Sequence, residues 1–157
     1  MGRRSIRSDK TVYQLAREEA GYTRAQASEA LDFMTESRIE RIENGTLPFP
    51  EEVIAMSKAY RKPELCNYYC SHECAIGKQS VPQLSNADNL PAIVLEILAS
   101  LNTLSREKDR LIEISADGDI SPDEMKDFEQ IRNKLDELSV TIDSLKLWLD
   151  KKKANSR

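Results

Sequence analysis

The 157-residue sequence lacks the long apolar runs that mark membrane proteins. No run approaches the roughly 20 apolar residues of a spanning helix, so we expect no membrane partner. The N-terminus is basic, but no apolar segment follows it, which argues against a secretory signal. We therefore expect a cytoplasmic protein.

Signatures of catalysis are also missing. The chain has no glycine-rich phosphate loop and no nucleophile motif, and its single histidine, His72, lies among cysteines. We expect that it is not an enzyme, because only metal-centred chemistry at the cysteines would support a catalytic reading.

An excess of positive charge is absent as well. Residues 1–62 hold 11 Lys and Arg against 10 Asp and Glu, a net of +1, whereas residues 85–157 hold 11 against 15, a net of −4. A net of +1 is small for a domain that neutralises phosphates. The main basic cluster is at residues 1–8, where Arg3, Arg4 and Arg7 form an arm that is either solvated or contributes phosphate or minor-groove contacts.

The most informative stretch that is present runs from Thr23 to Gly45 and predicts two short helices joined by a tight turn. Thr23 and Gln26 have the spacing of a capping box, and Thr35 can cap the second helix. Gly45 stands where a left-handed C-cap residue is expected. Helices are also expected over residues 9–20 and 51–60. A small core is predicted from Leu15, Leu31, Ile39, Ile42, Val53, Ile54, Met56 and Tyr60.

Residues 11–62 resemble the helix-turn-helix of the Cro and phage-repressor (Xre-like) family, through Ile42-Glu43-Asn44-Gly45 at the end of the second helix. The resemblance implies an all-α, lambda-repressor-like domain that binds double-stranded DNA as a transcriptional regulator. The chain departs from the family at Leu31-Asp32-Phe33-Met34-Thr35, which is one residue longer than the usual Leu-Gly-Val-Ser turn and has no glycine.

The resemblance also implies which residues contact DNA. The first turn of the 36–44 helix faces base edges, which assigns Glu36, Ser37 and Arg38 to recognition, with Arg41 one turn later. Arg38 is suited to bidentate pairing with guanine. Residues at the start of the preceding helix match family positions that contact the phosphate backbone and brace the recognition helix: Thr23, Arg24 and Gln26.

The acidic character of the 36–44 helix leaves a second function open. Glu40 and Glu43 either contact DNA or pair with neighbouring arginines. The alternative to a regulator is a protein–protein interaction adaptor that keeps the helix-turn-helix fold without DNA binding.

The segment that follows Pro63 contains every cysteine of the chain. On a helix, Cys66 and Cys70 lie one turn apart, with Cys74 a further turn along. Together with His72 they are candidate ligands for zinc or, with an outside fourth ligand, for an iron–sulfur cluster. The other interpretations are buried structural cysteines and a redox-responsive thiol pair.

The C-terminal part predicts a long antiparallel, coiled-coil-like helical hairpin over residues 89–153, after a linker at 79–88 that separates it from residues 1–78. Its apolar seam is expected at Leu90, Val94, Ile97, Leu101, Leu104, Lys108 and Leu111, and at Phe128, Ile131, Leu135, Leu138, Ile142, Leu145 and Leu149. Because a two-helix core is thin, the sequence favours a homodimer with a four-helix arrangement.

The hairpin turn has two interpretations. Residues 113–124 can be aligned with a calcium-binding EF-hand loop, but Glu113 stands where that loop requires Asp. The same residues also read as an ordinary turn, in which Gly118 ends one helix and Ser121 with Glu124 forms a capping box for the next.

Overall fold

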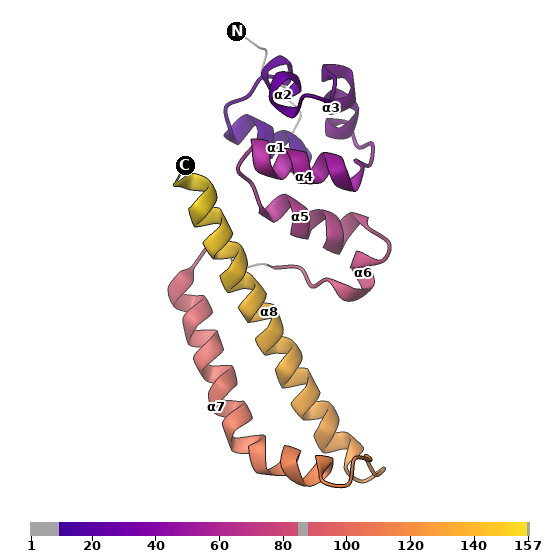
Figure 1. Ribbon diagram of the computed structural model, residues 1–157, viewed down its shortest axis with the longest axis vertical. Coiled ribbons are helices and arrows are strands. Elements are labelled where there is room, and N and C mark those ends of the chain that lie inside the picture. The colour runs from indigo at the N-terminus through magenta and orange to yellow at the C-terminus, as the bar shows by residue number, and fades with distance from the viewer. Residues whose placement is uncertain (1–9, 85–87, 157) are drawn as a thin grey trace. The chain divides into compact units, whose positions relative to one another are not determined.

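The computed structural model describes residues 10–84 and 88–156, and every regular element in these ranges is helical (Figure 1). The predicted all-α class is therefore confirmed. The chain divides into two compact units. One contains the helices before Leu84 and the residues from Asp150 onward, and the other comprises Leu84–Leu149.

The first unit begins with four short helices: α1 (Val12–Glu19), α2 (Arg24–Leu31), α3 (Glu36–Glu43) and α4 (Pro50–Ala59). Their shared core is a cluster of buried side chains from all four helices and from α5, namely Tyr13, Ala16, Ala27, Leu31, Met34, Ile39, Ile42, Val53, Met56, Tyr60 and Leu65. This cluster holds α3 against α1, α2 and α4.

Two residues of the predicted core are instead exposed. Leu15 is 43% exposed and Ile54 is 47% exposed. In α1 the buried face is formed by Tyr13, Ala16 and Arg17 rather than by Leu15. Leu15 misses the core because the buried tyrosine and arginine rotate the inward face of the helix away from it.

The cysteine-bearing segment forms three short elements: α5 (Glu64–Tyr68), the π-helical turn η1 (Tyr69–Glu73) and α6 (Gly77–Ser80). A β-carbon on Gly77 would lie 2.2 Å from the carbonyl oxygen of Cys70, so only glycine allows this approach. Because the chain folds back here, α6 includes Gln79 and Ser80, which the sequence assigned to the linker.

The second unit contains α7 (Leu90–Ser115) and most of α8 (Met125–Asn155), which pack together as a hairpin. Its predicted seam is only partly buried. Ile131 is buried, but five predicted seam residues are between 38% and 49% exposed: Val94, Leu101, Leu135, Ile142 and Leu149. The least exposed residues of α7 are Ile93 and Ile114, and neither belongs to the predicted seam, so the helix is rotated relative to the predicted heptad.

The turn between α7 and α8 has the features of the ordinary turn. Gly118 adopts φ +77°, and the backbone N–H and hydroxyl of Ser121 donate to Glu124 Oε2 at 3.1 and 2.6 Å. Glu124 is thus engaged in capping. Within the described ranges, no group of three or more His, Cys, Asp or Glu side chains is arranged to hold a metal ion, so the calcium-loop reading gains no support.

Candidate nucleic-acid interface

The predicted caps of α2 and α3 are present. Gln26 N donates to Thr23 Oγ1 at 3.2 Å, and Thr23 N donates to Gln26 Oε1 at 2.9 Å, which completes the capping box. The N–H of Arg38 donates to Thr35 Oγ1 at 3.2 Å. These bonds satisfy amide groups that a helix start leaves without partners, and they set where each helix begins.

The turn between the two helices accommodates its extra residue through an unusual backbone conformation. Asp32 adopts φ +57°, in the region that glycine usually occupies. Met34 is then buried, and its carbonyl accepts a 2.7 Å hydrogen bond from the Ser28 hydroxyl, while Phe33 remains 62% exposed. The longer turn therefore still delivers Thr35 to the start of α3.

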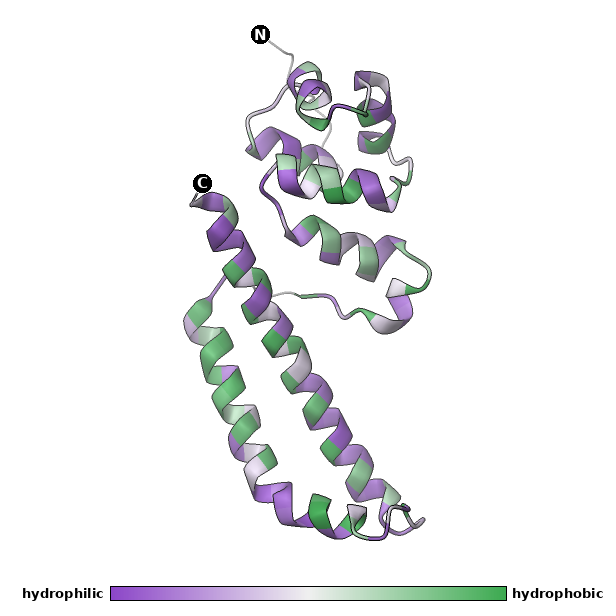
Figure 2. Cartoon of the chain, in the orientation of Figure 1, coloured by the Kyte–Doolittle hydropathy of each residue, from purple (hydrophilic) through white to green (hydrophobic). Residues whose placement is uncertain are grey.

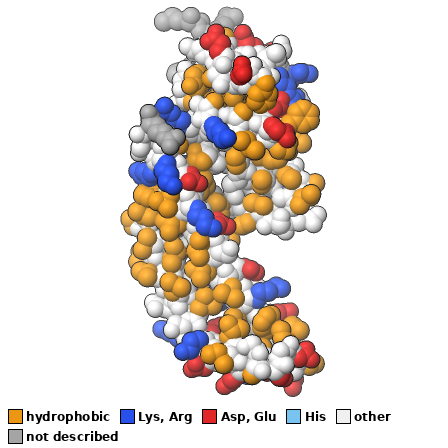
Figure 3. Space-filling view, viewed as in Figure 1, with side chains coloured by type: hydrophobic (Ala, Val, Ile, Leu, Met, Phe, Trp, Pro, Cys, Tyr) orange, Lys and Arg blue, Asp and Glu red, His pale blue; other side chains and the backbone are white. Residues whose placement is uncertain are grey.

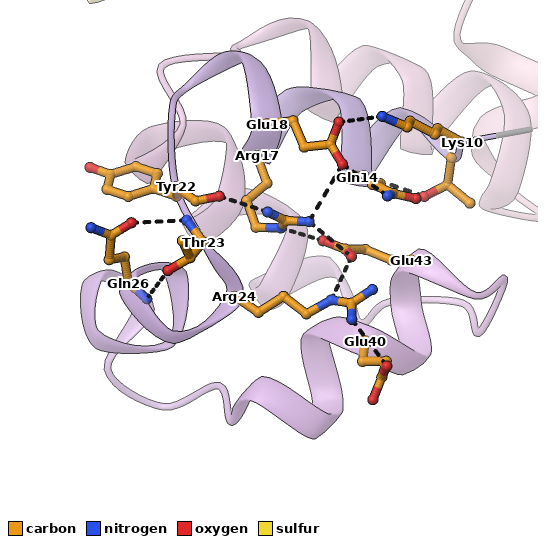
Figure 4. Close-up of polar contacts among 11 residues, drawn as sticks. Lys10, Gln14, Arg17, Glu18, Tyr22, Thr23, Arg24, Gln26, Glu40 and Glu43 are labelled. Carbon is orange, nitrogen blue, oxygen red and sulfur yellow. Dashed lines mark hydrogen bonds and ion pairs between the residues drawn. The ribbon is translucent and has the colours of Figure 1, made fainter. Parts of the chain in front are cut away.

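A buried ion-pair network ties α3 to α1 and α2 (Figure 4). Glu43 accepts from Arg17 Nε at 2.5 Å and from Arg24 Nε at 2.9 Å, and its side chain is 2% exposed. Arg17 also donates to the carbonyl of Tyr22 at 2.6 Å. Burial alone would lower the pKa of Arg17, but the hydrogen bonds and charge of Glu43 outweigh burial, so its pKa is raised.

The same network includes the exposed Glu40, which accepts from Arg24 Nη1 at 3.0 Å. Glu40 and Glu43 are thus paired with neighbouring arginines, as one of the two sequence interpretations expected. Arg24 lies at the start of α2, where the sequence placed a phosphate contact, but two carboxylates hold its guanidinium. Its side chain is 33% exposed, so one edge remains accessible.

Arg38 is similarly occupied. Its Nε and Nη2 donate to the two carboxylate oxygens of Glu52 at 2.7 Å each, and the guanidinium carbon lies 5.1 Å from the centre of the Phe49 ring. Glu52 also accepts from Phe49 N at 2.7 Å. Burial alone would raise the pKa of Glu52, but these hydrogen bonds and the charge of Arg38 outweigh it, so its pKa is lowered.

Arg38 therefore joins α3 to α4 in this structure, with its bidentate fork turned to a carboxylate of the same domain. The sequence predicted that the Arg38 guanidinium would pair with guanine, because Arg38 occupies the first turn of α3. Its ion pair with Glu52, fourteen residues later, cannot be predicted from the local sequence pattern.

The remaining residues of α3 form its outward surface. Glu36, Ser37 and Arg41 are exposed, as is Glu40. Among the described residues, no ion pair or hydrogen bond engages the guanidinium of Arg41, unlike those of Arg24 and Arg38. Arg41 is thus the arginine of α3 that is available to an outside partner. The predicted arm residues Arg3, Arg4 and Arg7 lie outside the described residues.

The predicted metal ligands do not assemble into a site. The ring of His72 stacks on Tyr68 at 4.5 Å, and its Nδ1 lies 2.8 Å from Ser71 Oγ and 3.1 Å from the carbonyl of Tyr68. Cys74 leaves the helix with an extended backbone, and its sulfur accepts from Gly77 N at 3.4 Å. In the part of the chain that the structure describes, no metal-holding group includes Cys66, Cys70, His72 or Cys74.

The thiol environment also bears on the redox interpretation. Burial raises the pKa of Cys70, and the neighbouring Cys74 and Cys66 raise it further. Since the thiolate is the reactive form, a raised pKa makes this thiol less reactive at neutral pH. The segment instead connects to the helical core, because the hydroxyl of Tyr13 donates to Glu73 Oε2 at 2.5 Å.

Comparison with known proteins agrees with this architecture. Residues 14–65 match the family model described as Helix-turn-helix, so this part of the chain is a helix-turn-helix domain of the Cro and phage-repressor, Xre-like type. The match supports a DNA-binding regulator, a class that is typically not enzymatic. No curated protein and no solved structure matches the chain. None of the described helices combines the length and apolar content that crossing a bilayer requires.

Proposed function

We propose that this chain is a sequence-specific, DNA-binding transcriptional regulator that works as a homodimer in the cytoplasm. The observation that carries the proposal is the capped α2–turn–α3 unit, in which buried ion pairs hold α3 with one face exposed. Two such units in a dimer would read two half-sites in successive major grooves. Regulation would follow from occluding or recruiting polymerase.

Within this proposal the residues divide by role. Ser37 and Arg41 face base edges, and Arg41 suits the two acceptors of guanine in the major groove. Arg38 braces α3 through Glu52, and Arg24 braces it through Glu43 while its exposed edge approaches a phosphate. We assign the cysteine segment a structural role, because Cys66, Tyr68 and Tyr69 pack against the core.

The test begins with selection of bound sequences from genomic DNA, followed by titration of Arg41→Ala on the selected site and on scrambled DNA. We expect specific binding to weaken about 10–100-fold per half-site, because one bidentate base contact is worth about 1–3 kcal/mol. Lys58→Ala is the matched control, since it removes one exposed positive charge from α4 instead of α3. An equal loss on both DNAs for both variants would refute base reading by Arg41.

A specific observation also favours the second candidate, a protein-interaction adaptor. Carboxylates occupy Arg24 and Arg38, while two large apolar side chains in the loop after α3 are exposed, Leu47 at 52% and Phe49 at 64%. Salt separates the two functions, because phosphate-mediated binding weakens steeply as salt rises. Folded protein that selects no DNA sequence at low salt would favour the adaptor.

A further inference from the structure

The hairpin buries few apolar side chains for its length. Among the described residues of α7 and α8, the buried apolar side chains are Ile93, Ile114, Ile131 and Leu147. Thr141 and Ser144 are also buried, and their hydroxyls donate to backbone carbonyls one turn earlier. A two-helix core of this size supplies little net stability.

Much of the apolar content of the hairpin is exposed at its open end, away from the turn. We define the open-end face as seven side chains that are between 38% and 67% exposed: Val94, Leu95, Leu98 and Leu101 of α7, with Leu135, Ile142 and Leu149 of α8. The N-terminal half of α7 is largely hydrophobic along its visible length (Figure 2).

The exposed residues of both helices lie on one side of the hairpin. At about 100° per residue, Val94, Leu98 and Leu101 lie roughly 80–140° around α7 from the buried Ile93. Leu135 and Ile142 lie roughly 40° and 100° around α8 from the buried Ile131 and Thr141, respectively, in the same rotational sense. Because α7 and α8 run antiparallel, offsets of the same sense bring both sets of exposed residues to the same side. Figure 3 shows hydrophobic side chains gathered over neighbouring parts of α7 and α8 on the face in view.

The size of the open-end face fits a protein interface. Its seven side chains are about half exposed on average, and together they offer roughly 600 Å² of apolar surface, against about 800 Å² buried per partner in a standard stable interface. This area is at the upper limit of the largest patch on a typical monomer. To cover this surface, a partner must present an apolar surface of similar area.

The chemistry of the face favours a second copy over a lipid surface. None of the seven residues is charged, so two copies meeting face to face bring no like charges together. Residues 85–157 carry a net charge of −4, from 11 Lys and Arg against 15 Asp and Glu, which disfavours an anionic membrane. Two further helices would also complete a four-helix bundle with a common core.

We propose that the open-end face is where a second copy of this chain docks, so that Leu98 and Ile142 lie inside a four-helix dimer core. This inference rests on the proposed function because it supplies the interface of the proposed dimer. Dimerisation through the open-end face itself requires no DNA. The interface overlaps the predicted heptad seam at Val94, Leu101, Leu135, Ile142 and Leu149 and adds Leu95 and Leu98, whereas Ile97 and Leu104 of that seam are partly buried.

The test is sedimentation equilibrium of the full chain with no DNA. Wild-type protein at about 10 µM should have twice the 17.9 kDa chain mass. The double variant Leu98→Glu/Ile142→Glu should weaken self-association at least about a hundredfold, because four charges would enter the dimer core. Thr103→Glu is the matched control, since it adds the same charge to a polar position of α7 five residues after Leu98, about 140° around the helix from it.

Helix content by circular dichroism identifies any variant that fails to fold, and Leu98→Ala/Ile142→Ala provides a milder change that should weaken association less. A monomeric wild-type chain, or a folded double glutamate variant that stays dimeric, would overturn the proposal, as would equal dissociation by Thr103→Glu. A dimer that selects no DNA sequence would support the open-end face as the dimer interface and refute the proposed function. A monomer that binds DNA specifically would refute the open-end face and the dimeric part of the proposed function, and would leave specific DNA binding in place.

Discussion

Replacing Arg38 with alanine distinguishes a brace from a base-reading residue. The substitution removes two 2.7 Å charge-assisted hydrogen bonds to Glu52, and it leaves the backbone N–H of Phe49 as a donor to that carboxylate. The side chains of Arg38 and Glu52 are only 16% and 9% exposed, so water replaces the lost contacts incompletely.

The expected loss in unfolding free energy is about 2 kcal/mol. Hydrogen bonds to charged groups contribute about 1.5–3 kcal/mol, whereas breaking a fully buried pair costs about 3–5 kcal/mol. The pair is partly open to solvent, which places the value toward the lower range. Arg41→Ala should change stability by less than about 0.5 kcal/mol, because Arg41 is exposed on the helix surface.

The chain contains its own probes for this measurement. All five tyrosines precede residue 70, and the single tryptophan is Trp148 in α8. In urea titrations, tyrosine circular dichroism therefore reports the helix-turn-helix unit and Trp148 fluorescence reports the hairpin. Only the tyrosine transition should shift in Arg38→Ala. A cycle with Glu52→Gln isolates the energy of the pair.

The opposite pattern would refute the bracing role. If Arg38→Ala keeps the tyrosine transition of the wild type but loses preference for the selected DNA site, the ion pair with Glu52 opens on binding and Arg38 reads a base. The double variant Arg38→Ala/Glu52→Gln would then show the same loss of selectivity.

Three further outcomes follow from the same domain. Because the pKa of Glu52 is lowered on folding, its contribution is complete above the unfolded pKa of about 4.3 and is lost as pH falls through the folded value; Glu52→Gln should flatten the acid branch of a pH–stability curve. Gly77→Ala should release α6, seen as faster amide exchange over residues 74–80 by mass spectrometry, because its β-carbon meets the Cys70 carbonyl. Glu43→Ala should lower the stability reported by tyrosine by about 3–5 kcal/mol, since Arg17 stays buried without its carboxylate.

Local chemistry explains which parts of the fold the sequence predicts well. Thr23, Gln26 and Thr35 act on amides within three residues, so their caps are visible in sequence spacing and are present in the structure. The same holds for Gly118 and for the Ser121–Glu124 pair in the hairpin turn. These features need no knowledge of tertiary packing.

The features that sequence missed depend on partners far along the chain. The orientation of α1 follows from Arg17 meeting Glu43, 26 residues later, and this contact turns Leu15 outward. Arg38 is occupied by Glu52 from another helix. In the cysteine segment, a π-helical turn and an extended backbone at Cys74 replace the regular helix that the spacing suggested.

The charge distribution leads to a final prediction about the N-terminal arm. Within residues 10–62, five of the eight basic side chains pair with carboxylates: Lys10, Arg17, Arg24, Arg38 and Lys62. Phosphate contacts in the proposed complex must therefore depend strongly on the few remaining cations, which include those of the arm.

Replacing Arg3, Arg4 and Arg7 with alanine should make the plot of log affinity against log salt shallower by about 2–3 per protomer, since each phosphate contact contributes about 0.9 to the slope. Preference for the selected site should persist, because phosphate contacts carry no sequence information. Removing three hairpin charges, by alanine at Arg106, Lys126 and Arg132, controls for net charge. A slope equal to that of the wild type in the arm variant would show that the arm leaves the phosphates untouched, and the neutralising charge would then have to come from Arg24, Arg41, Lys58 and Arg61.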